Sequence, residues 1–303
     1  MNSHTFMSAT AGAGASTMVS GDDSANSIAP AMSTADAFAC LATSISADAA
    51  RRAHALHLKA DPEVLHKLRV ALRRLRSLWW AYGPLLDRKD SELQRGEFKS
   101  LANAAGKTRD WDVLRDLLAG DRSTQHAFAS LLESVDEHRA DALLFSRRTI
   151  GNAGVEQILQ RALTGARDQL DLRPTSTTLV GFAEERVEAA EKALKKRVKR
   201  AVSDKDSGYA ALHEVRIAGK KQRYLLEFFS PVLDGSHQAT IERLTSVQDE
   251  LGKLNDLVTG ESILREYSFQ LGEPKAVSEA VSYLEDQKRR RMRGVHEILR
   301  TTW

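Results

Sequence analysis

The chain has 303 residues, of which 42% are apolar, so it can bury the core of one large domain or two small ones. Its single cysteine excludes an intrachain disulfide and fits a reducing compartment. No run approaches the ~18 apolar residues of a membrane helix, and the N-terminus shows no secretory signal. We therefore expect a cytoplasmic protein without membrane contact. The net charge of +3 divides into −4 for residues 1–50 and +7 for the remainder, so basic residues concentrate in particular segments.

The first 32 residues are rich in Ala, Ser, Gly and Thr and lack periodicity, which predicts a disordered tail. A first helix is expected to begin at Ser33 or Thr34, either of which can cap it, and to run to about Lys59.

The second predicted helix begins at Asp61, because this side chain can accept backbone N–H bonds and Pro62 suits the first helical position. It ends at Gly83-Pro84. At 100° per residue its leucines fall on one apolar arc. The opposite arc is basic: His66, Arg69, Arg73, Arg76 and Trp80, with Arg74 at its margin. Residues 64–86 contain no Asp or Glu. Like charges repel along a helix, so this arc predicts an anionic ligand.

The remaining chain also shows helical periodicity and no alternating pattern of strands, so we predict an all-α protein with antiparallel neighbours joined by short loops. A linker between two halves is expected at residues 171–178, which include Pro174. The predicted helices span residues 91–106, 110–118, 123–148, 154–166, 179–202, 212–233, 238–255, 257–267 and 274–299.

Two further segments carry clustered basic residues. The helix over 179–202 ends in a block that includes Lys196, Lys199 and Arg200, and the last helix contains Arg289 and Arg290. Basic residues near a helix C-terminus also complement the helix dipole, so part of the first block needs no ligand.

The basic arc recurs further along the chain. An offset of 147 positions aligns His66 with His213, Arg69 with Arg216 and Arg73 with Lys220. The same offset aligns Arg74 with Lys221 and Arg76 with Arg223. A segment beginning at Gly106 matches one beginning at Gly252 at an offset of 146. Two matches in the same order predict an internal duplication.

These motifs resemble those of the CHAD family, the conserved-histidine α-helical domain. The resemblance rests on H-x-x-R-V-x-x-R-R-L-R, on L-H-x-x-R-x-x-x-K-x-x-R-Y-x-x-E-x-F, and on the segments around Arg109-Asp110 and Leu251 to Asp256. It spans about Ala35 to Trp303. It implies two four-helix bundles about a pseudo-twofold axis, at about 33–170 and 179–303, and binding of inorganic polyphosphate through a basic surface.

Other roles for the polar residues are weaker predictions. His66 and His213 are more consistent with a hydrogen bond or a phosphate contact than with metal or base chemistry. His54 and His57 lack a third metal ligand at a suitable spacing. Asp110, Asp112 and Asp256 are candidate ligands of a divalent ion, but the preferred interpretation is that each caps a helix or pairs with an arginine of the two helices that carry the basic arcs. We expect no metal and no cofactor.

The predicted function is therefore non-catalytic binding of inorganic polyphosphate, with association to polyphosphate granules. The alternatives are a nucleic-acid-binding protein or, less favoured, an enzyme of polyphosphate metabolism, although no P-loop, G-x-S-x-G, H-E-x-x-H or E-x-E-x-K motif is present. The sequence leaves the oligomeric state open. The predicted binding residues are His66, Arg69, Arg73, Arg74, Arg76, His213, Arg216, Lys220, Lys221, Arg223, Lys196, Lys199, Arg200, Arg289 and Arg290.

Overall fold

The computed structural model describes residues 27–59, 61–120, 122–172, 175–203 and 208–303. These residues form ten α-helices and one short 3₁₀ helix without any strand, which confirms the all-α prediction. The helices are α1 Thr34–Leu58, α2 Pro62–Ala81, α3 Arg88–Leu118, α4 Arg122–Ala127, α5 Ala129–Asn152, α6 Val155–Leu172, α7 Leu179–Ser203, α8 Tyr209–Phe229, η2 Ser230–Val232, α9 Gln238–Glu266 and α10 Pro274–Thr302.

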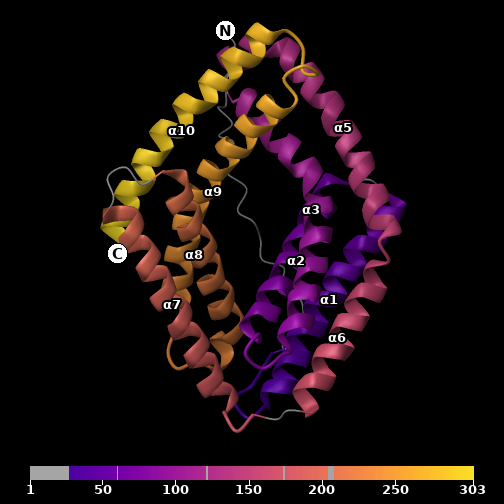
Figure 1. The fold of residues 1–303 in the computed structure, drawn as a ribbon, viewed down its shortest axis with the longest axis vertical. Helices are drawn as coiled ribbons and strands as arrows, with labels where there is room; N and C mark the ends of the chain where they lie inside the picture. Colours follow the sequence, from indigo (N-terminus) through magenta and orange to yellow (C-terminus); the bar gives the residue numbers. More distant parts are fainter. Residues whose placement is uncertain (1–26, 60, 121, 173–174, 204–207) are drawn as a thin grey trace, which may run out of the picture.

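The helices form a diamond-shaped outline with two sides (Figure 1). Helices α2 and α3 lie on the inner face of one side, and α8 and α9 lie on the inner face of the other. The sides meet where α2 contacts α8, where α1 contacts α7 and where α3 contacts α9. This arrangement directs the two basic arcs predicted from the sequence toward the centre of the molecule.

Each side packs its helices in the same order. Helix α1 packs on α2, α2 on α3 and α3 on α5, while α7 packs on α8, α8 on α9 and α9 on α10. The first side has six helices, because Gly154, with φ of 61°, separates α5 from α6 and the short α4 precedes α5. The internal duplication stays a prediction, since similar packing alone does not establish it.

The start of α2 is formed by local sequence, as predicted. The Asp61 carboxylate accepts a hydrogen bond from the Glu63 backbone N–H at 2.9 Å, and Pro62 occupies the first helical position. At the start of α1 the Ser33 hydroxyl accepts from the Asp36 N–H at 3.0 Å. These caps fix where the two helices begin.

Several predicted helix boundaries are wrong. Helices α3 and α9 are continuous through Gly106 and Asn255, where the sequence suggested breaks. A glycine costs a helix only about 1 kcal/mol, and the packing of α3 against α2 and α5 outweighs that cost. The helix expected over 123–148 is instead divided at Phe128, whose side chain is buried in the core.

Two hydrophobic cores join the sides of the molecule. In the first, Phe38 and Tyr82 lie edge to face at 4.9 Å, and Tyr82 also contacts Phe182 of the second side at 4.9 Å between ring centroids. In the second, Trp111 and Leu264 belong to one cluster that spans α3, α5, α9 and α10. Such contacts between aromatic rings add about 0.5–1.5 kcal/mol beyond the burial of their area. The cores therefore hold the inner helices at fixed positions.

The predicted tail, residues 1–32, lies mostly outside the described residues. Its last part is described, and there Ile28 is only 3% exposed and belongs to the first core. The predicted tail boundary at residue 32 is therefore wrong, because residue 28 already packs on the folded domain. Among the described helices, none is both long enough and apolar enough to cross a membrane.

Candidate functional site

A cavity of about 610 Å³ lies between α2, α3, α8 and α9. Its walls carry eight of the fifteen binding residues predicted from the sequence, four from α2 and four from α8. These are His66, Arg69, Arg73, Arg76, His213, Arg216, Lys220 and Lys221. The structure thus brings the two basic arcs together on one cavity.

Two cations of the cavity come from α3 and were missed as binding residues. Arg95 and Arg109 line the wall beside the α2 row. Arg109 belongs to a motif noted in the sequence, whereas Arg95 lies in an ordinary charged stretch of α3 and gave no signal. The cavity is then lined by eight Lys and Arg side chains against two carboxylates, those of Asp110 and Asp256. This excess of positive charge is what an anionic ligand would neutralise.

Arg69 is fixed against the backbone of α3. Its Nη1 donates a hydrogen bond to the carbonyl oxygen of Ala102 at 3.2 Å, and its guanidinium lies against Gly106. Burial lowers the pKa of Arg69, while the nearby Asp110 carboxylate acts in the opposite direction. The guanidinium remains charged, because arginine is protonated throughout the physiological range.

Several buried nitrogens on the cavity wall have no hydrogen-bond partner among the described residues. They are Nδ1 of His66 and the Nε atoms of Arg95 and Arg216. A buried polar group without a partner costs about 1–3 kcal/mol, and more when it is charged. The Nε atoms of the two arginines are donors, for which the oxygens of an anion would supply acceptors.

Lys220 is the most perturbed of the cavity cations. Burial, reinforced by the charges of Arg73, Arg216, Arg223 and Arg69, lowers the pKa of its ammonium from 10.5 to about 6. Burial also lowers the pKa of His66 and of His213, each with help from a neighbouring arginine. Near neutral pH the empty cavity therefore holds less charge than its composition suggests.

The sequence suggested that the carboxylates of the region cap helices, and this prediction is wrong. Asp110 and Asp112 lie within α3 and Asp256 lies within α9, because both helices are continuous. Burial raises the pKa of Asp110 against the opposing effect of Arg69, and Asp112 pairs with Arg139 of α5. The arginine that pairs with Asp112 belongs to α5 rather than to α2 or α8, so the predicted pairing with an arginine of a basic arc is wrong for Asp112. The described residues contain no group of three or more His, Cys, Asp and Glu that could hold a metal ion.

One end of the cavity continues into a small pocket of about 180 Å³ at Trp80. The Lys221 ammonium lies 4.4 Å and the Arg186 guanidinium 4.9 Å from the centroid of the Trp80 rings. Arg186 also donates to the Trp80 carbonyl oxygen at 3.3 Å. These cation–π contacts orient the two cations at the end of the cavity.

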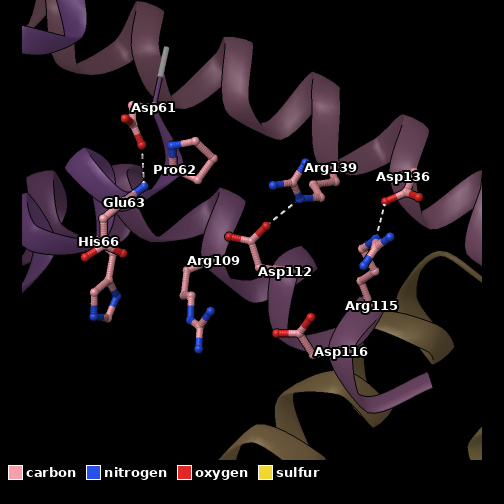
Figure 2. A pocket seen from close by; sticks show the side chains of 10 residues that line it. All are labelled: Asp61, Pro62, Glu63, His66, Arg109, Asp112, Arg115, Asp116, Asp136 and Arg139. Carbon is pink, nitrogen blue, oxygen red and sulfur yellow. Dashed lines mark hydrogen bonds and ion pairs between the residues drawn. The ribbon is translucent and has the colours of Figure 1, made fainter. Parts of the chain in front are cut away.

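The other end leads to a larger hollow of about 860 Å³, which shares His66 and Arg109 with the basic cavity (Figure 2). Here five carboxylates face three arginines. Arg115 pairs with Asp136 at 2.7 Å, and Arg139 pairs with Asp112. Since two of its three arginines are already neutralised, this hollow is a poorer anion site than the basic cavity, although it is larger.

The other seven predicted binding residues lie outside the basic cavity. Arg74 faces the ring of Phe228 at 5.9 Å, and Arg223 pairs with Glu227 and donates to Gln248 at 3.1 Å. The remaining five are exposed on the outer helices: Lys196, Lys199 and Arg200 on α7, and Arg289 and Arg290 on α10. Their binding role stays a prediction, separate from the cavity.

The sequence profile of the CHAD domain matches residues 42–265, most of the chain. The chain belongs to the CHAD family. Its fold is similar to the crystal structure of the CHAD domain from the plant Ricinus communis, with a TM-score of 0.79 and 24% identity over 90% of this chain and 94% of that one. PptA from Streptomyces chartreusis is also similar, with a TM-score of 0.68 and 19% identity over 90% and 99% of the two chains. At these identities the likeness shows the fold alone. No curated protein matched the chain.

In this CHAD protein the cavity can bind a ligand with many negative charges. Arginine offers planar forks to phosphate oxygens, and lysine offers a mobile point charge. Because the Arg and Lys side chains come from α2, α3 and α8, and so from both sides of the molecule, a single extended anion in the cavity would contact all three helices.

Proposed function

We propose that this CHAD protein binds inorganic polyphosphate in the cavity between α2, α3, α8 and α9, without catalysing a reaction on it. The observation that carries the proposal is the excess of eight Lys and Arg over two carboxylates around one cavity. A polymer with a negative charge on each phosphate matches this array better than a small ligand does. Its affinity would come largely from the release of counterions, as in nucleic-acid binding.

Association with polyphosphate granules follows from the same proposal, since a protein that binds the polymer would be retained where the polymer accumulates. Nucleic acid is the alternative ligand, because its backbone also carries one charge per phosphate. Proteins that hold single strands usually stack bases on exposed aromatic rings. Trp80 already has Lys221 and Arg186 on its rings, which supports polyphosphate over nucleic acid.

A competition experiment tests the choice of ligand. Labelled long-chain polyphosphate is bound at a fixed salt concentration and displaced by unlabelled polyphosphate, double-stranded DNA or single-stranded RNA, at equal concentrations of phosphate. We expect unlabelled polyphosphate to displace the probe at phosphate concentrations at least about tenfold lower than those that either nucleic acid requires. Equal or stronger displacement by either nucleic acid would favour the alternative. A change in the length of the polyphosphate during the incubation would show an enzyme.

A matched pair of variants tests the place of binding. Arg73→Gln with Arg76→Gln removes two charges from the cavity, and Lys192→Gln with Lys195→Gln removes two from the exposed face of α7. We expect the first pair to weaken binding at least tenfold and to reduce the slope of log K against log salt by ~0.7–0.9 per lost contact. The second pair should change affinity less than threefold. Equal losses would show a general effect of charge rather than a cavity site.

A further inference from the structure

Gly106 of α3 lies directly beneath the guanidinium of Arg69. A Cβ atom at position 106 would lie 1.4 Å from Nη1, 2.5 Å from Cζ and 3.2 Å from Nε of Arg69. Distances below 3.0 Å are not compatible with both groups staying in place. Any side chain at position 106 therefore displaces the Arg69 guanidinium from its position.

The contact of Arg69 with α3 is specific rather than incidental. Its Nη1 donates to the carbonyl oxygen of Ala102, which lies one helical turn before Gly106 on α3. The bond and the missing side chain together hold the Nη1 end of the guanidinium against the helix. Arg69 spans from α2 to α3 in this position, where it lines the cavity together with Arg73 and Arg216.

The second side of the molecule lacks this arrangement. Gly252 of α9 is the counterpart of Gly106 in the matched sequence segment, but a Cβ at position 252 would meet nothing within 4 Å. Arg216, the counterpart of Arg69, has a buried Nε without a partner among the described residues. The two arginines thus occupy matched positions in the sequence but differ in how they are held.

We propose that Gly106 is a positioning residue of the anion-binding cavity, because its missing side chain provides the space that holds Arg69 in place. This inference rests on the proposed function, since it treats Arg69 as a contact of the bound polyphosphate. Arg69 is then held in place by α3, whereas no glycine of α9 holds Arg216 in the same way.

A glycine within a helix is otherwise expected to weaken the fold. Replacing a mid-helix glycine by alanine normally increases stability, because alanine loses less backbone entropy on folding. If Gly106 acts only through Arg69, whose side-chain end is flexible and can move aside, Gly106→Ala keeps or raises the melting temperature while it weakens binding. Stability and affinity then change in opposite directions, which a purely structural role does not produce.

The experiment compares Gly106→Ala with Gly252→Ala in the full chain, measuring melting temperature and affinity for long-chain polyphosphate. We expect Gly106→Ala to lose about 10- to 100-fold in affinity, the range for one hydrogen-bonded charge, without a lower melting temperature. Gly252→Ala should keep its affinity within twofold. Equal affinities of both variants and the unmodified protein would overturn the inference alone, whereas absence of binding by the unmodified protein overturns the proposed function and this inference with it.

A double-mutant cycle with Arg69→Ala tests whether the two residues act as a unit. Once the arginine is removed, adding Gly106→Ala should cost no further affinity. If Gly106→Ala alone fails to fold, the double variant should fold, because the clash has been removed. Failure of both to fold, or an additional loss of affinity in the double variant, would show that Gly106 acts through the helix backbone and would overturn the proposal.

Discussion

We predict that the charge state of Lys220 makes the proposed binding of polyphosphate depend on pH. In the free protein its pKa is about 6, because the ammonium is buried and four arginines surround it. A bound polyphosphate would place negative charge beside this group and offset the repulsion, so its pKa would rise toward the ordinary 10.5. Binding near neutral pH is then expected to take up about one proton per protein.

The sign and size of the effect follow from linkage. Below pH 6 Lys220 is already protonated in the free protein and contributes no slope. Well above pH 6 each pH unit lowers the affinity about tenfold, so raising the pH from 6 to 8 costs up to ~50-fold if the pKa in the complex is well above 8. The pKa values of His66 and His213 are also lowered, so these histidines would add to the proton uptake on binding.

The stability of the free protein should change in the opposite direction. The unfolded chain holds Lys220 at its ordinary pKa of 10.5, so between about pH 6 and 10.5 the unfolded state binds the additional proton. The contribution of Lys220 to the free energy of unfolding therefore rises with pH across this window. Tight binding of the anion and a high free energy of unfolding are thus favoured at opposite ends of the range.

Titration calorimetry in two buffers of different ionisation enthalpy, at pH 7.5, measures the number of protons taken up. Long chains are required, because they contain few terminal phosphates that titrate near this pH. Lys220→Arg is the matched control, since arginine keeps its charge. This variant should bind with a nearly flat profile above pH 7. Binding by the unmodified protein without proton uptake, or an equal pH slope in the variant, would refute the reasoning.

Two further predictions concern the single cavity and the first core. Titration with long-chain polyphosphate should show one class of binding site per protein molecule, because α2 and α8 line the same cavity. Two separable binding events in calorimetry would contradict a shared site. Ile28→Ala should lower the free energy of unfolding by about 2–5 kcal/mol, because this side chain is only 3% exposed and leaves a cavity in the core. Chemical denaturation measures this cost, and a value below about 1 kcal/mol would show that Ile28 does not pack as described.

Features that depend on neighbouring residues could be predicted from the sequence. Helical periodicity and the capping by Asp61 and Ser33 act within one or two turns, so the all-α fold and the start of α2 were accessible. The same periodicity separated the basic arc of α2 from its leucines, and Arg69, Arg73 and Arg76 do line the cavity. The sequence by itself therefore determined which face of α2 and which face of α8 is charged.

Features that depend on how helices pack could not be predicted in this way. Arg95 lies on a third helix whose sequence shows no basic arc, yet packing of α3 on α2 brings it to the cavity. Lys196 and Arg289 belong to equally basic stretches, but their helices form the outer edges of the molecule (Figure 1). A run of charged residues in the sequence indicates only that one face of a helix is polar. The positions of the helix axes decide which of these charges converge on the cavity.

Burial decided the remaining properties of the site. The helix is not interrupted at Gly106 because tertiary packing outweighs a propensity cost of about 1 kcal/mol, and the same glycine accommodates Arg69. Lys220 and Lys196 are the same residue type, but Lys196 is exposed, whereas Lys220 is buried among arginines that lower its pKa to about 6. Desolvation and close like charges arise only when distant segments fold together, so only the tertiary structure determined the charge state of the cavity.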